Sequence, residues 1–308
     1  EYNLSVGVTA LDAVTTGDAN IAIGHDALSA NTTGSGNLAI GYGAYDNADT
    51  EGNNMAIGRD ALGGSINGGE TNIAIGNYSL DANTSGDLNI GLGYVSLTQN
   101  STGSSNVGIG NSAMQLNQTG SSNTTLGNNS MKSSLSSSYN TAVGAEALFD
   151  ANRTADTDGY NTALGYNAGN TGTNDITTGN KNTLLGASTA ASAAAGTNQT
   201  VIGFGASGTA DNSVTIGNSS VTAWYPGSDD TADLGSNSVE FKDLYIDGTA
   251  NLDAVDIDAG AIDGAAIGAN SASTGAFTTI TASTSLDVTG STGIILENDE
   301  TITNSTDT

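Results

Sequence analysis

The sequence has no cysteine, one proline, one histidine and only five lysine or arginine residues among its 308 residues. The absence of cysteine excludes disulfide bonds, thiolate catalysis and zinc sites built on cysteine. Thirty-two acidic residues against five basic ones give a formal net charge of −27. Nucleic acids and anionic lipid surfaces both require clustered positive charge, so we expect no nucleic-acid partner.

Long apolar segments are also missing. No apolar run in the sequence approaches the roughly 20 residues that a membrane-spanning helix needs. We therefore expect no membrane insertion.

Glycine, by contrast, occurs 43 times, and 36% of the residues are hydrophobic. A chain this rich in Asn, Ser, Thr and Gly resembles disordered sequences in composition. Its aliphatic residues, however, recur at regular intervals, as in NIAIGHDAL at 20–28 and NIAIGNYSL at 72–80. The regular spacing favours a repeat architecture over disorder.

The repeat unit reads Asn, aliphatic, small, aliphatic, Gly, and a further apolar residue follows four positions after the glycine. We assign thirteen units, spaced by 14 to 21 residues and most often by 17. Their central glycines are Gly7, Gly24, Gly41, Gly58, Gly76, Gly91, Gly110, Gly127, Gly144, Gly165, Gly186, Gly203 and Gly217. The residues that best represent the structural repeat are Asn20, Ile23, Gly24, Asn37, Ile40, Gly41, Asn54, Ile57, Gly58, Asn72, Ile75, Gly76, Ile109 and Gly110.

Alternation with a period of two predicts a short β-strand in each unit. The glycine then allows a bend, a second short strand ends in the next apolar residue, and a polar loop returns the chain. Each unit is thus one coil of an all-β, parallel β-solenoid, or β-roll, of about thirteen coils. Stacked coils would bury the aliphatic residues, with Ile23 over Ile40 and Ile40 over Ile57, and would align the asparagines into a ladder.

A single coil offers few large side chains for a core. We expect the second apolar position, such as Leu28, to be poorly covered in a lone coil. We also expect the small residues opposite the aliphatic pair, such as Ala22 and Ala39, to let another chain approach closely. Both features favour a homotrimer of parallel solenoids, so the chain itself is the first partner that we predict.

The string NSVTIG at 212–217 and its variants make residues 1 to about 220 similar to the head repeats of trimeric autotransporter adhesins. That resemblance implies left-handed parallel β-rolls associated as trimers. The spacing of 17 residues is longer than the short coil of those heads.

The repeat stops after the only tryptophan and the only proline, Trp224 and Pro226. We divide the chain into a solenoid shaft at 1–222, a β-rich connector at 223–260 and a short-strand segment at 261–308 that we expect to be incomplete. The strings DLGSNSVEFKDLYIDGT at 233–249 and IGANSASTGAFTTITAS at 267–283 resemble connectors of bacteriophage tail-fibre proteins. That resemblance implies a virion protein whose partners are other fibre or baseplate proteins and a host surface receptor, for which a glycan is one candidate.

Catalytic and ligand-binding patterns are sparse. His25 lies in a variable position after Gly24 and is expected on the surface, so we predict no catalytic residue and no enzyme activity. The acidic runs at 150–160 and 256–264 lack the spacing of known calcium loops, and we predict neither a metal site nor a cofactor. Tyrosines beside the bends, such as Tyr42 and Tyr94, have amphipathic rings that could stack on sugars. We expect them instead to pack in the core or between chains.

The sequence therefore predicts a structural fibre protein, a phage tail-fibre shaft that contributes to host attachment and is located in the virion. A bacterial surface adhesin head, located on the cell surface, is the first alternative. A tailspike that degrades polysaccharide through paired carboxylates is a second and less favoured one.

Overall fold

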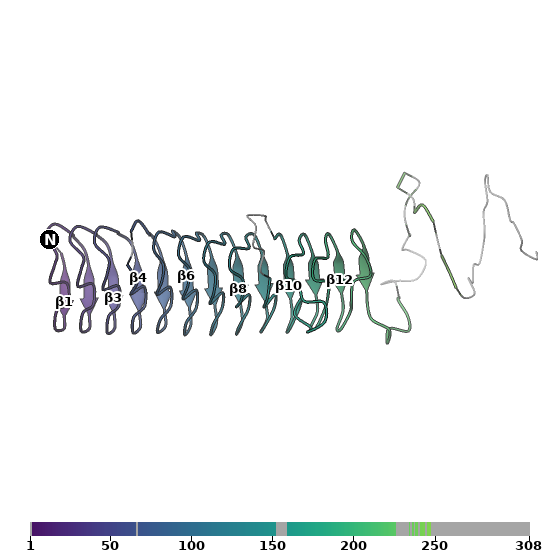
Figure 1. Ribbon diagram of the computed structural model, residues 1–308, viewed down its shortest axis with the longest axis horizontal. Helices are drawn as coiled ribbons and strands as arrows, with labels where there is room; N and C mark the ends of the chain where they lie inside the picture. The colour runs from purple at the N-terminus through teal and green to yellow at the C-terminus, as the bar shows by residue number, and fades with distance from the viewer. Residues whose placement is uncertain are drawn as a thin grey trace, which may run out of the picture. The chain divides into compact units, whose positions relative to one another are not determined.

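The computed structural model describes residues 2–65, 67–151 and 159–225, together with residues 234, 236, 238–239, 241–243 and 245–247. The chain divides into two compact units, Glu1–Asp230 and Thr231–Thr308. The first unit is a parallel β-solenoid, as the repeat predicts, and its coils follow one another in a row (Figure 1).

Thirteen strands form one sheet in chain order, and each strand pairs in parallel with the next. Each strand has three residues. The strands are β1 Leu4–Val6, β2 Ile21–Ile23, β3 Leu38–Ile40, β4 Met55–Ile57, β5 Ile73–Ile75, β6 Ile90–Leu92, β7 Val107–Ile109, β8 Thr124–Leu126, β9 Thr141–Val143, β10 Thr162–Leu164, β11 Thr183–Leu185, β12 Thr200–Ile202 and β13 Val214–Ile216.

A glycine follows every strand because the bend there needs a positive φ and close backbone contact with the next coil. Gly110, after β7, has a φ of 133°. A Cβ atom at this position would lie 2.5 Å from the carbonyl oxygen of Gly127 in the next coil. No L side chain fits such a position without displacing the backbone, which explains why the glycine recurs.

The sequence assignment of the sixth unit is wrong by two residues. The glycine at the bend is Gly93, with a φ of 138°, and Gly91 lies within strand β6 beside Ala74 of β5. The unit is therefore Asn89-Ile90-Gly91-Leu92-Gly93. This register matches the repeat at every position, whereas the Gly91 register requires Asp87 in place of the asparagine.

The predicted second strand of each coil is not found among the residues that the structure describes. After the bend the chain makes turns, with positive φ at the residues two and four after the glycine, such as Asp60 at 49° and Leu62 at 53°. Left-handed residues cannot continue an extended strand. Neighbouring coils still pair through the backbone here, since the Leu62 N–H donates to the Ser79 carbonyl at 2.9 Å.

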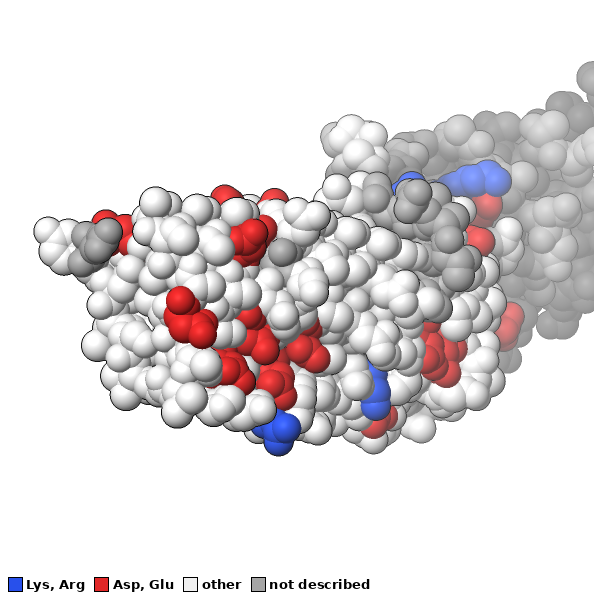
Figure 2. All heavy atoms as spheres, turned by 60° about the vertical axis from the view of Figure 1, so that its left-hand side comes forward, with Lys and Arg blue, Asp and Glu red and all other residues white. Residues whose placement is uncertain are grey.

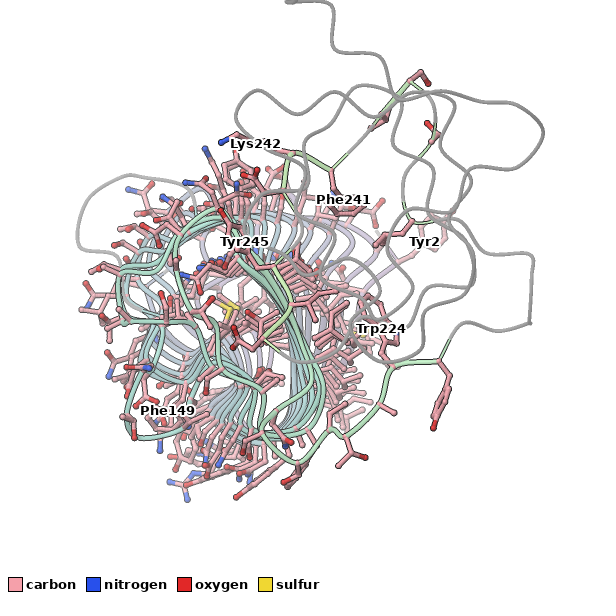
Figure 3. The ribbon with its side chains drawn as sticks, turned by 90° about the vertical axis from the view of Figure 1, so that its right-hand side faces the viewer. Tyr2, Phe149, Trp224, Phe241, Lys242 and Tyr245 are labelled. Atoms are coloured by element: carbon pink, nitrogen blue, oxygen red, sulfur yellow. The ribbon has the colours of Figure 1, made fainter. Side chains whose placement is uncertain are left out.

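The interior is built from the small residue of each strand and the large residue four after each glycine. Ala22, Ala39, Leu28 and Leu62 are all fully buried. The expectation that a lone coil covers the second apolar position poorly is therefore wrong. Seen along the stack, the coils superpose around this narrow core (Figure 3), in which Met114 and Met131 are also fully buried.

A ladder of buried asparagines runs through the interior, as predicted. The Asn20 Oδ1 atom accepts a hydrogen bond of 2.9 Å from the Asn37 N–H, and Asn37 Oδ1 accepts one of 2.9 Å from the Asn54 N–H. Most of the Nδ2 groups donate to a loop carbonyl of the next coil, as Asn20 does to Gly34 at 2.9 Å. The ladder satisfies polar groups that the narrow core would otherwise bury unpaired.

A second, shorter ladder lies beside the first, and the two share acceptors, since Asn72 Nδ2 and Asn83 Nδ2 both donate to the Gly86 carbonyl at 2.9 Å. Asn100 Nδ2 donates to Asn83 Oδ1 at 2.9 Å, and Asn117 Nδ2 donates to Asn100 Oδ1 at 2.7 Å. In the next coil Ser134 takes the asparagine position, and both Asn117 Oδ1 and Ser134 Oγ are buried without a hydrogen-bond partner. The serine side chain is too short to continue the ladder.

One coil interior contains a larger polar group. Tyr45 replaces the usual leucine and is fully buried, and its hydroxyl accepts a hydrogen bond of 2.6 Å from Asn54 Nδ2. Burial, together with the nearby Glu51 carboxylate, raises the pKa of Tyr45. Glu51 is itself buried and accepts hydrogen bonds from the N–H groups of Thr50 at 3.1 Å and Gly68 at 2.9 Å.

The coils after β9 keep the core volume by moving the large residue. Gly169 stands where earlier coils have leucine, and a Cβ there would contact Leu148 at 2.8 Å and Leu184 at 3.1 Å. Ile176, from the longer loop of this coil, is fully buried in the same region. Leu184 and Val201 then occupy the inward strand position that alanine fills elsewhere.

Little of the second unit falls within the described residues. Ser236 and Val239 form an isolated antiparallel bridge, and none of the described residues at 241–243 and 245–247 lies in a strand. Residues 248–260 of the predicted connector and the segment at 261–308 lie outside the described part of the chain.

Candidate interaction surface

The aliphatic pairs of the strands point outward, so the prediction that stacking buries them is wrong. Ile21 is 38% exposed and Ile23 is 36% exposed, whereas Ala22 between them is fully buried. Period two assigns the two faces of a strand but not which face is inside. The narrow coil admits only the small residue, and the larger pair is left on the surface.

The predicted repeat residues thus form three columns rather than one site. The asparagines form the interior ladder, and the glycines form the bends. The isoleucines form part of an outward column, in which Ile40 pairs with Ile57 and Ile57 with Ile75 in strict register. The same register makes the outward face of the sheet two parallel ranks of side chains along the whole stack (Figure 3).

Two regions of this face differ. In the N-terminal coils, which we define by strands β1–β7, both ranks are aliphatic, apart from one methionine. In the C-terminal coils, defined by β8–β12, the first rank consists of threonines at positions 124, 141, 162, 183 and 200. The second rank stays aliphatic throughout. The division of the face into two regions was not predicted, although Thr visibly replaces the first aliphatic residue of the repeat from position 124 onward.

The outward face of β1–β13 contains no charged residue, and the charges lie on other sides of the coils. Asp46 and Asp81 gather with Asp26 and Asp60 beside the bends of the N-terminal coils (Figure 2). Partial burial, followed by repulsion from neighbouring carboxylates, raises the pKa of Asp46 and of Asp81. Because the acidic sides of two chains repel each other, the uncharged apolar strip is the face through which two chains would associate.

The strip is long enough to matter. Thirteen strands at about 4.8 Å each give a length of roughly 60 Å, and the two ranks lie about 6.6 Å apart. Contiguous apolar patches of a few hundred Å² on soluble proteins mark interaction sites.

No protein-family model, no curated protein and no solved structure matches the chain. Function is therefore inferred from the repeat geometry and from the sequence resemblances. Among the described residues no helix has the length and apolar character needed to cross a membrane. Within the same residues, no group of three or more His, Cys, Asp and Glu side chains could hold a metal ion.

The remaining sequence candidates take ordinary positions. His25 is exposed, and its Nδ1 lies 2.7 Å from a carboxylate oxygen of the adjacent Asp26. Four asparagines that stand in N-x-[ST] glycosylation sequons, Asn31, Asn83, Asn100 and Asn117, are fully buried and so are closed to glycan attachment. The acidic runs considered for calcium lie wholly or partly outside the described residues, at 152–158 and 256–264.

Proposed function

We propose that the chain is a structural fibre protein whose solenoids associate side by side, as a homotrimer, through the outward aliphatic face of the sheet. The observation that carries this proposal is the uncharged outward face of thirteen strands, on which the second rank is aliphatic throughout and the first rank is apolar from β1 to β7. Its side chains are partly exposed in the single chain, and burying the remaining exposed surface of each Ile or Leu would contribute about 0.5–1.5 kcal/mol.

A threefold axis parallel to the stack suits the two-rank geometry. In a closed ring of three chains, one rank of each chain meets the other rank of the next chain. The coils of all three chains then stay at the same level, so the register of one chain supports that of its neighbours. The resemblance to trimeric adhesin heads supports the same arrangement.

In this proposal the fibre is a phage tail-fibre shaft in the virion, which holds receptor-binding parts away from the particle and contributes to host attachment. The tail-fibre-like strings at 233–249 and 267–283 support the assignment to a phage. Tail-tube or baseplate genes beside the coding gene would support it further. A following heptad-rich stalk and membrane barrel would instead support the adhesin head.

Sedimentation equilibrium of the full chain at micromolar concentration tests the self-association. We expect three times the chain mass of 30.3 kDa. The variant Ile40→Asp, Ile57→Asp places two charges in the strip and should sediment as a monomer. Its matched control, Asn111→Asp, Asn128→Asp, adds the same charge at exposed bend positions and should remain a trimer.

Circular dichroism should show that both variants keep the fold of the parent chain. A monomeric parent chain would refute the association, and a dimer or tetramer would refute the threefold arrangement. Cleavage of host capsule into shorter chains by the purified protein would favour the tailspike reading and contradict a purely structural role.

A further inference from the structure

A second surface column, distinct from the apolar strip, runs along the bends of the N-terminal coils. We call it the aromatic column and define it by His25, Tyr42, Arg59, Tyr78 and Tyr94. The rings of His25 and Tyr42 stack with centroids 5.3 Å apart and planes 11° from parallel. The Arg59 guanidinium lies 5.5 Å from the Tyr42 ring and 5.9 Å from the Tyr78 ring.

The column continues to Tyr94, whose ring meets Tyr78 edge to face at 6.2 Å. Tyr42 and Tyr94 are 53% and 52% exposed. His25 of the preceding coil and Arg59 of the following coil cover the faces of the Tyr42 ring, so this residue offers a ligand its ring edge and hydroxyl. Four of the five members directly follow a bend glycine, and this position brings them onto the same edge of successive coils.

The backbone holds these residues at the spacing of the coils. The carbonyl of His25 accepts a hydrogen bond of 3.0 Å from Gly43, that of Tyr42 one of 2.9 Å from Asp60, and that of Arg59 one of 2.9 Å from Tyr78. The rings are therefore ordered before any ligand arrives, which lowers the entropic cost of binding. A ligand with a repeating chain could contact several members at once.

Carboxylates line the column on the same coils. Asp26 lies against His25, and Asp60 lies 3.1 Å from the Arg59 Nε atom. Asp46 and Asp81 stand close enough to Asp60 for repulsion to raise the pKa of both, in addition to the effect of burial. This surface offers hydrogen-bond acceptors beside apolar ring surface and would repel a polyanion.

From this combination we propose that the aromatic column binds an uncharged polysaccharide lying along the axis of the solenoid. The C–H groups of its sugar rings would pack on the exposed ring surface of Tyr94 and along the edge of Tyr42. Its hydroxyls would donate to the carboxylates of Asp26 and Asp60 and accept from the Arg59 guanidinium. The inference uses the proposed attachment role only for its biological meaning, since it needs neither trimer formation nor a virion.

Affinity electrophoresis tests the proposal with defined probes. The full chain is run in native gels that contain increasing dextran, galactomannan or hydroxyethylcellulose, with polygalacturonate as the anionic comparison. We expect at least one neutral polymer to retard the protein and polygalacturonate not to. The variant Tyr42→Ala, Tyr94→Ala should weaken retardation about tenfold, since 1.4 kcal/mol corresponds to that factor. The variant Tyr42→Phe, Tyr94→Phe should keep most of it because the rings remain.

The structure supplies a matched control in a second exposed pair of tyrosines. Tyr139 and Tyr160 stack at 5.1 Å with planes 12° apart, on coils of β9 and β10, and they belong to a different column. The variant Tyr139→Ala, Tyr160→Ala should leave retardation unchanged. No retardation by any neutral polymer, or equal losses in the two alanine variants, would overturn the proposal. Sedimentation of the same samples reports self-association independently, so failure of one proposal is distinguishable from failure of the other.

Discussion

The N-terminal and C-terminal coils share one backbone but present different surfaces and interiors. Strands β1–β7 present two apolar ranks, whereas β8–β12 present one threonine rank and one aliphatic rank. The interior differs as well, because the large buried residue lies after the bend in the first region and partly within the strand at Leu184 and Val201 in the second. The coil tolerates these exchanges because its path is fixed by the bend glycines and the asparagine ladder, which both regions keep.

This difference indicates where association should be strongest. A threonine buries less apolar surface than isoleucine, and its hydroxyl needs a partner when it leaves water. The N-terminal coils should therefore form the tightest part of the interface. The C-terminal coils should contribute less, and more through the second rank than through the first.

Making the first region resemble the second gives the largest expected effect. The variant Leu38→Thr, Met55→Thr, Ile73→Thr replaces three neighbouring members of the first rank. Each change loses about 1 kcal/mol of apolar burial, at nine positions in a trimer. We expect self-association to weaken by more than a hundredfold in sedimentation experiments, with the fold retained.

The reverse exchange serves as its control. Thr141→Ile, Thr162→Ile, Thr183→Ile extends the two apolar ranks into the C-terminal coils and should tighten association. If both triple variants left the association constant unchanged, the strip would not be the interface.

A smaller effect, on stability rather than assembly, should separate inner coils from the last ones. Gly110→Ala places a Cβ 2.5 Å from a backbone oxygen, whereas Gly203→Ala meets nothing nearer than the Gly217 Cα at 3.3 Å. Both changes carry the cost of a non-glycine residue at positive φ, about 1–3 kcal/mol, and only the first adds a backbone clash. Urea unfolding should show a loss of about 3–5 kcal/mol for Gly110→Ala and roughly half of that for Gly203→Ala. Equal losses would show that the close approach between coils is relieved by small shifts.

Much of this fold could be predicted from the sequence. The recurrence of Asn, aliphatic and Gly residues indicated a parallel solenoid of about thirteen coils, and the asparagine ladder followed from the position of Asn20 and its equivalents. These features repeat, so an error in one unit does not change the reading of the others. The sixth unit shows this, since Gly91 and Gly93 were confused without consequence for the architecture.

The orientation of the strands could not be predicted in the same way. Alternation places Ala22 and Ile23 on opposite faces but is symmetric with respect to inside and outside. Hydrophobicity alone favours burial of the isoleucine. The coil is too narrow for that side chain, so the alanine is buried instead. Coil width depends on the turns, where residues such as Leu62 adopt positive φ. Because Leu62 is not a glycine, the sequence gives no sign of that conformation. The sequence therefore predicts the small residues, such as Ala22, as the face that another chain approaches, whereas the structure buries them and exposes the aliphatic pair.

A substitution at the end of the second asparagine ladder should stabilise the fold. It stops at Asn117, whose Oδ1 is buried without a partner beside the equally unpartnered Ser134 Oγ. Ser134→Asn would extend the ladder by one coil and satisfy Asn117. We expect a gain of about 1 kcal/mol, the usual contribution of one hydrogen bond, measured as a higher urea midpoint. Ser134→Ala removes the unpaired hydroxyl without supplying the bond and should gain less, and a loss with asparagine would show that this coil lacks the room.

The smallest expected effect concerns the acidic side of the N-terminal coils and depends on pH. Burial and neighbouring carboxylates raise the pKa of Asp46 and Asp81 in the fold. Between the ordinary and the raised pKa the folded chain binds more protons than the unfolded chain, so its stability falls as pH rises through that window. Asp81→Asn removes one of the opposed charges and should raise stability at pH 7 by about 0.5 kcal/mol, a modest value because solvent screens the group. The gain should vanish at pH 3, where the carboxyl is protonated in both states. A gain from Asp81→Asn that persisted at pH 3 would indicate a packing effect instead of charge repulsion.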